Sequence, residues 1–370
     1  MLVRYALPSV YPDIFVRAYG DVTYPLAMTT SAGTGESDTI LASSHFLRKF
    51  NVTSQLETIP LGKTDLRVTP LGLGVWQWGD TRMWGYGKSY GDADLKPVYD
   101  ATLAAGINFI DTAEIYGRGR SETVVGQFMR DTHTRDRLVL ATKFAPFPWR
   151  LGGQRLIDAL HASLNRLGVP QVDLYQIHFP IPPVSIETWM AAMAEAVQQG
   201  LIRAVGVSNY SVAQTRRAHA ALAKRGVPLA SNQVEYSLLQ RKPETSGLTA
   251  VCRDLGVTII AYSPIAKGLL SGKYTPDHLP PGLRSRIYNR TYVTKIQPLI
   301  GLLKDIGQGQ GVANSAKTPV QVALNWLICK GAVPIPGAKN LRQAQENFGA
   351  LGWRLSDAEV QALDQASDSL

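Results

Sequence analysis

From Leu71 onward, short apolar runs of strand length alternate with longer amphipathic stretches. The short runs are rich in Val, Ile and Leu, and polar and apolar positions do not strictly alternate in them. Parallel strands that are buried on both faces have this composition. Eight strand–helix units in succession favour a closed α/β barrel, the (β/α)8 TIM barrel, over an open sheet. The expected strands are Leu71–Trp78, Asn108–Ala113, Leu138–Phe144, Val172–His178, Ile202–Ser208, Leu229–Tyr236, Val257–Pro264 and Val333–Gly337.

The stretches between these runs have helical spacing, as in Gln154–Leu167 and Ile186–Gln199. Several are followed by a glycine just before the next strand, where a left-handed residue commonly ends a helix. These glycines are Gly106, Gly168, Gly200, Gly226 and Gly256. Before the first strand, the segment LETIPLGKTDLRVT has two short runs around Gly62–Asp65, which predicts a β-hairpin that caps the barrel.

Residues 1–55 are rich in Ser, Thr, Tyr and Pro and have no clear period. We predict a disordered or targeting leader over 1–55, followed by the barrel domain over 56–370. Acidic residues such as Asp13 and Glu36 are unusual in a transit peptide, and Pro8 and Pro12 interrupt the apolar start that a secretory signal needs. Within the barrel, Pro264–Arg290 is a long, basic, Gly- and Pro-rich segment, which is typical of a functional loop.

Composition narrows the classes of partner. The net charge is +9, but Lys and Arg are spread along the chain without a basic block, so no nucleic-acid partner is expected. Cys252 and Cys329 lack metal-ligand spacing, so we expect no metal site, no disulfide and a reducing intracellular compartment, either cytoplasm or plastid. The longest apolar run, Val257–Ala266, is too short to span a membrane. Monomer and homo-oligomer both remain open.

The active site of such a barrel lies at the carboxyl ends of its strands. Asp111 closes the second strand in FIDTAEIYG, and Tyr116 follows five residues later. Lys143 ends the third strand and His178 the fourth. Taken singly, each has a structural explanation: an Asp–Lys ion pair, a core histidine or a packing aromatic. Polar groups at consecutive strand ends are costly unless they are paired or used, so the four together indicate a site.

These four residues suit carbonyl reduction. Hydride transfer to a carbonyl leaves an alkoxide that needs a proton, and a free tyrosine with a pKa of about 10 is a poor acid at neutral pH. An ammonium beside the phenol is expected to lower the pKa of Tyr116, and Asp111 would hold Lys143 in place. His178 would hydrogen-bond the reacting oxygen. We therefore predict Tyr116 as the general acid.

Several segments resemble the aldo-keto reductase family: DTAEIYGRGRSETVVG, GVSNY, NQVEYS, YSPIAKGLLSGKY and IPGAKNLRQAQEN. The similarity runs from about Leu56 to Leu355 and is strongest towards bacterial and plant plastid-type members with the ending LGWxLS, here Leu351–Ser356. The resemblance implies NADP-dependent reduction of an aldehyde or ketone. It also implies that Asp111, Tyr116, Lys143 and His178 form a catalytic tetrad.

The resemblance further implies a nucleotide site, although the chain has no Rossmann G-x-G-x-x-G. Ser208, Asn209 and Gln233 would bind the nicotinamide carboxamide, and Tyr262 would stack on its ring. Many relatives have Arg where Gln343 stands, but Lys339 remains, so NADPH is favoured over NADH. The expected cofactor residues are Trp76, Ser208, Asn209, Gln233, Tyr262, Ser263, Pro264, Gly268, Leu269, Lys273, Gly337, Lys339, Gln343, Glu346 and Asn347.

An aromatic substrate pocket is expected from Trp78, Trp84, Phe144 and Trp149, and it favours a small carbonyl compound with a flat or hydrophobic part. Three other functions are alternatives that the residues favour less. The barrel could serve as a cofactor-binding regulatory or partner module, or as a Schiff-base aldolase that uses Lys143. A metal-dependent hydrolase is disfavoured, because the strand ends lack the His/Asp cluster that it requires.

Overall fold

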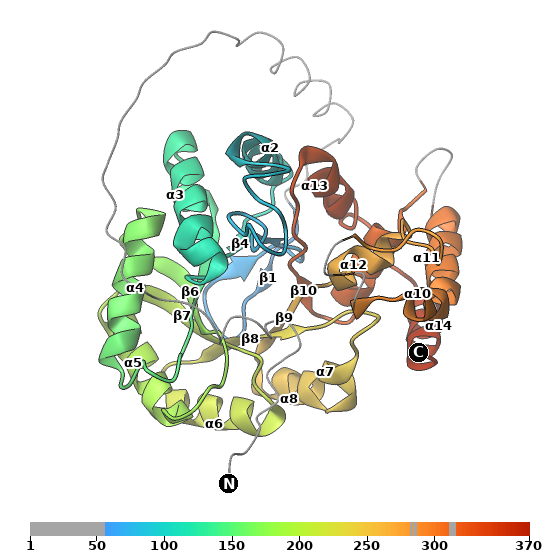
Figure 1. Cartoon of the computed structure of the whole chain (residues 1–370). Coiled ribbons are helices and arrows are strands. Elements are labelled where there is room, and N and C mark those ends of the chain that lie inside the picture. The colour runs from blue at the N-terminus through green and yellow to red at the C-terminus, as the bar shows by residue number, and fades with distance from the viewer. Residues whose placement is uncertain (1–55, 282–283, 285–286, 311–315) are drawn as a thin grey trace, which may run out of the picture. The chain divides into compact units, whose positions relative to one another are not determined.

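The structure, a computed structural model, describes residues 56–281, 284, 287–310 and 316–370 (Figure 1). The predicted leader over 1–55 lies outside these residues and stays a prediction. Within the described residues, no helix has the length and apolar character needed to cross a membrane. The same residues contain no group of three or more His, Cys, Asp or Glu side chains that could hold a metal ion.

Eight parallel strands form one sheet and are hydrogen-bonded in chain order. Each strand lies inside its predicted run. The backbone N–H groups of Gly72 and Gly74 donate to the carbonyls of Pro334 and Pro336 at 3.0 and 3.2 Å, which links the first strand to the last. The expected (β/α)8 architecture is confirmed. The strands are β3 (Leu73–Gly74), β4 (Phe109–Asp111), β5 (Val139–Phe144), β6 (Val172–Ile177), β7 (Ile202–Ser208), β8 (Leu229–Glu235), β9 (Thr258–Tyr262) and β10 (Val333–Pro334).

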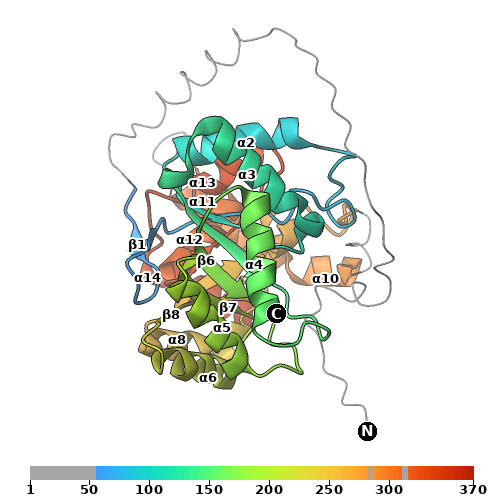
Figure 2. The same ribbon diagram turned by 90° about the vertical axis from the view of Figure 1, so that its left-hand side faces the viewer.

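Helices surround the strands (Figures 1 and 2). Gly168 and Gly256 adopt the left-handed conformation that ends α4 and α8, as predicted. The α-helices are α2 (Asp92–Ala104), α3 (Arg120–Thr132), α4 (Gln154–Leu167), α5 (Ile186–Gln198), α6 (Val212–Ala223), α7 (Lys242–Thr245), α8 (Leu248–Leu255), α10 (Arg290–Lys295), α11 (Gln297–Gly309), α12 (Pro319–Cys329), α13 (Leu341–Phe348) and α14 (Asp357–Asp368). Short 3₁₀ segments are η1 (Tyr116–Gly119), η2 (Arg135–Arg137) and η3 (Ala266–Ser271).

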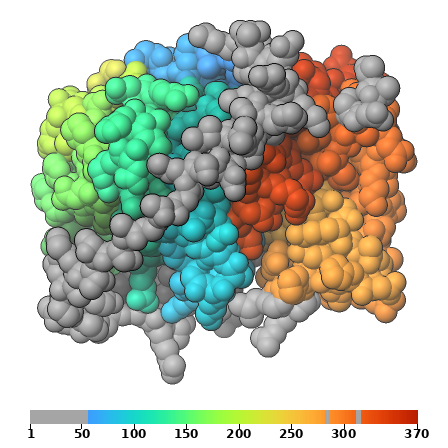
Figure 3. Space-filling model, turned by 90° about the horizontal axis from the view of Figure 1, so that it is seen from above, coloured from blue at the N-terminus to red at the C-terminus, as the bar shows by residue number. Residues whose placement is uncertain are grey.

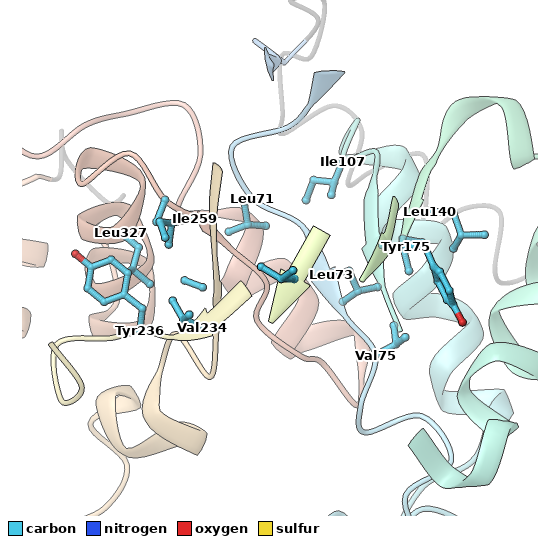
Figure 4. Close-up of a cluster of buried hydrophobic side chains, with 14 of the residues drawn as sticks. Leu71, Leu73, Val75, Ile107, Leu140, Tyr175, Val234, Tyr236, Ile259 and Leu327 are labelled. Carbon is cyan, nitrogen blue, oxygen red and sulfur yellow. The ribbon is translucent and has the colours of Figure 1, made fainter. Parts of the chain in front are cut away.

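The strands separate two hydrophobic layers. Leu140 of β5 belongs to the large outer core between strands and helices, whereas its neighbours Val139 and Ala141 belong to the smaller inner core. Successive side chains of a strand point to opposite faces, which explains this division. Figure 4 shows part of the outer core, with Leu73 and Tyr175 among the buried side chains.

A β-hairpin adds apolar side chains to the inner core. Strands β1 (Ile59–Pro60) and β2 (Arg67–Val68) pair antiparallel, which confirms the predicted hairpin. Leu61 and Leu66 of this hairpin are buried with the inner side chains of the barrel strands. At the turn, the N–H group of Gly62 donates to Thr258 Oγ1 of β9 at 2.7 Å. The hairpin is therefore fixed to the barrel by both apolar contacts and hydrogen bonding.

We predict that Gly62→Ala weakens this attachment. Gly62 has φ +61°, and a Cβ atom there would lie 2.5 Å from the carbonyl oxygen of Ala230. Gly200→Ala is the matched control, since Gly200 has φ +71° but no atom within 4 Å of the added Cβ. The free energy of unfolding of the control should fall by about 1–2 kcal/mol because of backbone strain. Gly62→Ala should lose at least about 1 kcal/mol more from the clash. If urea unfolding gave the same loss of unfolding free energy for both variants, the predicted clash at Gly62 would be contradicted.

Helix α13 lies next to α2, although the two are far apart in the sequence. The two helices pack against each other, and α13 also contacts α12. In the space-filling view of Figure 3, the red surface of α13 lies between the cyan surface around α2 and the orange surface of α10 and α11. This packing brings the loop that precedes α2 close to the residues that precede α13, so that Lys339 lies against the ring of Tyr90.

Candidate active site

A polar layer follows the inner apolar core towards the carboxyl ends of the strands. It contains Asp111 of β4, Lys143 of β5, Gln176 of β6 and Gln233 of β8, all of them buried. Lys143 forms an ion pair with the Asp111 carboxylate. The side-chain amides of Gln176 and Gln233 donate to Asp111 Oδ2 at 2.9 and 2.8 Å. Asp111 is thus a buried anion with three donors, as a desolvated carboxylate requires.

Tyr116 and His178 lie against this layer. Lys143 Nζ donates to Tyr116 Oη at 3.3 Å and to the Thr112 carbonyl at 2.8 Å. The rings of Tyr116 and His178 meet edge to face, with centroids 5.7 Å apart, and the centroid of Trp76 lies 6.2 Å from that of Tyr116. The fold therefore brings together the four residues that were expected to form the tetrad.

Burial governs the protonation of the site. It raises the pKa of Tyr116 well above 10, and the charge of Asp111 acts in the same direction. Burial also lowers the pKa of Lys143, which the Asp111 carboxylate opposes, and it lowers the pKa of His178 well below 6.5, helped by the charge of Lys143. The expectation that Lys143 lowers the pKa of Tyr116 is therefore wrong. The cost of desolvating the phenolate outweighs the effect of the neighbouring ammonium. Tyr116 and His178 are both neutral near pH 7.

Gln176 was not among the site residues expected from the sequence, although strand alternation could have identified it. It stands two residues before His178 in DLYQIHFP, and alternate residues of a strand face the same side. His178 itself stacks on Phe179 with a centroid separation of 4.3 Å. Its buried Nδ1 atom has no hydrogen-bond partner among the described residues. An unpartnered nitrogen in a buried site is a feature that a ligand would satisfy.

The residues expected to bind the carboxamide are neighbours of His178. Asn209 Nδ2 donates to the His178 carbonyl at 3.1 Å and to Ser208 Oγ at 3.0 Å. Tyr262 Oη donates to Asn209 Oδ1 at 3.0 Å. Ser208 Oγ donates to the backbone carbonyl of Gln233 at 2.8 Å. These contacts hold Ser208, Asn209 and Tyr262 together at one side of the tetrad.

Three basic side chains gather farther out, and we call Lys273, Arg284 and Lys339 the cation cluster. Lys273 Nζ and Arg284 Cζ lie 4.9 and 6.0 Å from the ring centroid of Tyr274, whereas Lys339 Nζ lies 5.1 Å from that of Tyr90. Burial lowers the pKa of Lys339, and repulsion from Arg284 and Lys273 adds to this. Among the described residues, none of the three forms an ion pair with an acid. Arg284 was not identified in the sequence, where it stands in a long basic loop.

Around Lys339, several of the expected cofactor residues are linked to one another. Gln343 Oε1 accepts a hydrogen bond from the Lys339 N–H at 2.9 Å, and Asn347 Nδ2 donates to the Gly337 carbonyl at 3.4 Å. Glu346 pairs with Arg342 at 3.7 Å. Four other expected cofactor residues, Ser263, Pro264, Gly268 and Leu269, lie just after β9 and in η3, on the segment that leads to Lys273. Cations without acid partners, together with the open Nδ1 of His178, fit an anionic nicotinamide nucleotide.

The four residues predicted to line the substrate pocket lie in different parts of the structure. Trp78 is buried in the outer core against Phe128, and its Nε1 donates to the Ala338 carbonyl at 3.1 Å. Phe144 is equally buried and packs on Trp189 of α5. Both positions correct the expectation that these residues line the pocket, because their side chains belong to the layer between strands and helices.

The other two pocket residues lie in loops. Trp84 contacts Trp76, with ring centroids 5.6 Å apart. Trp149 is 62% exposed and stacks on Phe147 at 4.8 Å. These two tryptophans remain candidates for contacts with bound molecules.

Comparison with known proteins agrees with this site. Residues 70–368 match the Aldo/keto reductase family, so the chain belongs to that family. It is accordingly an NAD(P)-dependent oxidoreductase that acts on small-molecule carbonyl compounds.

Two curated relatives are similar over most of their length. Pyridoxal reductase, chloroplastic, of Arabidopsis thaliana is 40% identical over 82% of this chain and 84% of its own length. An NADP(+)-designated aldo-keto reductase of Schizosaccharomyces pombe is 34% identical over 77% and 85%.

Solved structures agree with the fold. A thermostable aldo-keto reductase in complex with the inhibitor epalrestat has a TM-score of 0.68 and 31% identity, and the match covers 84% of this chain and all of that one. Glycerol dehydrogenase of Gluconobacter oxydans has a TM-score of 0.71 and 26% identity over 84% and 94%. The barrel and the family assignment therefore have independent support.

Proposed function

We propose that this protein reduces an aldehyde or ketone to an alcohol with NADPH, with Tyr116 as the general acid. The observation that carries this proposal is the 3.3 Å hydrogen bond from Lys143 Nζ to Tyr116 Oη, beside a neutral His178. When bound, NADPH supplies the hydride. Proton transfer and the positioning of the substrate are assigned to side chains of the protein.

The proton path follows from the hydrogen bonds. Tyr116 stays protonated at neutral pH and gives its proton to the oxygen of the substrate. Lys143 stabilises the phenolate that remains, because its ammonium already donates to Tyr116 Oη. Asp111 keeps Lys143 charged and in place, and Gln176 and Gln233 hold the Asp111 carboxylate. Neutral His178 orients the reacting oxygen through a ring nitrogen.

NADPH is proposed over NADH because of the cation cluster. Lys273, Arg284 and Lys339 would hold the phosphates, and Ser208, Asn209 and Gln233 the carboxamide. The S. pombe relative, whose name specifies NADP(+), supports the same choice.

Lys339→Ala should therefore weaken NADPH binding by about tenfold or more, and NADH binding by less, since a charge-assisted contact to phosphate contributes about 1.5–3 kcal/mol. Fluorescence titration with each nucleotide measures both effects. Lys224→Ala, at an exposed position just after α6, is the control and should change neither affinity. Equal losses for NADPH and NADH would contradict a role for Lys339 in selecting the phosphorylated cofactor.

A flat or hydrophobic carbonyl compound is the proposed substrate class, since the ring of Trp76 lies beside Tyr116. Pyridoxal is the first compound to test, because the A. thaliana relative is named a pyridoxal reductase. The assay follows NADPH consumption with pyridoxal and with a panel of aromatic and aliphatic aldehydes. Tight NADPH binding without turnover on any of them would favour the partner-module alternative.

A further inference from the structure

The loop between β3 and α2 holds Trp84 in a fixed place. Asp80 Oδ1 accepts hydrogen bonds from the backbone N–H groups of Arg82 and Met83 at 3.0 and 2.7 Å, and from that of Trp84 at 3.4 Å. The N–H group of Tyr86 donates to the Asp80 carbonyl at 3.0 Å. Four hydrogen bonds thus set the course of the backbone at Trp84.

The ring of Trp84 connects two parts of the site. On one side it meets Trp76 at a right angle, and Trp76 in turn lies beside Tyr116. Lys339 Nζ and Arg284 Cζ each lie 5.7 Å from the centroid of the Trp84 ring. Trp84 is therefore in contact with the cation cluster and with the aromatic side chain next to the proposed acid.

The indole nitrogen of Trp84 lacks an acceptor. Its Nε1 atom is buried and has no hydrogen-bond partner within the part of the chain that the structure describes. A buried N–H without an acceptor costs free energy. The ring that carries it lies beside two cations that form no ion pair with an acid among the described residues. One acceptor that carries negative charge would satisfy all three groups.

We propose that Trp84 Nε1 donates a hydrogen bond to a phosphate oxygen of the cofactor, together with Lys339 and Arg284. This inference rests on the proposed function. It makes Trp84 a cofactor-binding residue instead of the substrate-pocket residue expected from the sequence. Because the same ring packs on Trp76, binding of the phosphate also fixes the aromatic wall beside Tyr116.

The test uses Trp84→Phe in the full-length protein, since Phe keeps an aromatic face for Lys339 and Arg284 but removes the N–H group. The probe is adenosine 2′,5′-bisphosphate, which carries phosphates and lacks nicotinamide, and its Kd is measured by calorimetry. We expect Trp84→Phe to raise this Kd about tenfold, equivalent to about 1.4 kcal/mol. Trp189→Phe is the control and should leave Kd within about twofold, because Trp189 lies on α5 in the outer core and its buried Nε1 also has no hydrogen-bond partner among the described residues.

The outcomes separate the inference from the proposed function. If the wild-type protein binds neither NADPH nor the bisphosphate, the proposed function fails. If it binds both and Trp84→Phe leaves the Kd unchanged, only the role of Trp84 fails. A rise in KM for the carbonyl substrate alone, with normal bisphosphate binding, would return Trp84 to the substrate pocket and overturn the inference. Circular dichroism of Trp84→Phe confirms that a weaker affinity does not reflect misfolding.

Discussion

Tyr116→Phe is expected to lower kcat for carbonyl reduction by about 10²–10⁴-fold, the usual contribution of a positioned general acid. The variant keeps the aromatic ring that packs on His178 and Trp76, and it removes only the hydroxyl that accepts from Lys143. Because that hydroxyl is proposed to act on the substrate, the Kd for NADPH should stay within about twofold of wild type. Single-turnover measurements with saturating NADPH test the chemical step directly.

Tyr175→Phe is the matched control for this experiment. Tyr175 is buried like Tyr116, but it belongs to the outer core, and its hydroxyl has no hydrogen-bond partner among the described residues. Loss of that hydroxyl should leave turnover essentially unchanged. If Tyr116→Phe retained wild-type turnover, Tyr116 would not be the acid, and the proton would have to come from another group.

Asp111→Ala is expected to destabilise the folded protein by about 3–5 kcal/mol, because it leaves the Lys143 ammonium buried without its counter-charge. Gln176 and Gln233 would also lose the acceptor of their side-chain amides. Turnover should fall as well, since Lys143 would no longer be held beside Tyr116. The free energy of unfolding in urea, measured at constant pH, is the direct readout.

The control for Asp111→Ala is Asp65→Ala. Asp65 pairs with Arg203 at 2.7 Å, but its side chain is 76% exposed. Solvent screens such a pair, so its removal should cost less than about 1 kcal/mol. If the two variants lost the same stability, the buried carboxylate would not be the centre of the polar layer, and its proposed role in holding Lys143 would be wrong.

Two of the expected pocket residues belong to the outer core, and the sequence could have placed only one of them there. Phe144 directly follows Lys143, so strand alternation alone already places it on the opposite face, and this signal was available. Trp78 stands at the end of the expected strand Leu71–Trp78, but in the structure it lies in the loop after β3, where no period fixes the direction of a side chain. Its place depends on a hydrogen bond to Ala338, a residue near the other end of the chain. Long-range contacts of this kind leave no local pattern.

The sequence by itself determined the number and order of the barrel strands and the hairpin, and it was enough to expect that the four residues proposed as the tetrad lie together. Apolar runs mark buried strands locally, and Asp111, Lys143 and His178 each stand at the end of such a run. Strand ends meet at one face of a barrel, so position in the chain was enough to expect them together.

Only the tertiary structure decided the rest of the site. The cation cluster and Trp84 come from three loops far apart in the sequence. The packing of α13 against α2 helps to bring these loops together. The pKa of Tyr116 likewise could not be read from neighbouring charges, since its direction is set by burial. Desolvation is a property of the folded interior, and for that reason the protonation of the site became clear only with the fold.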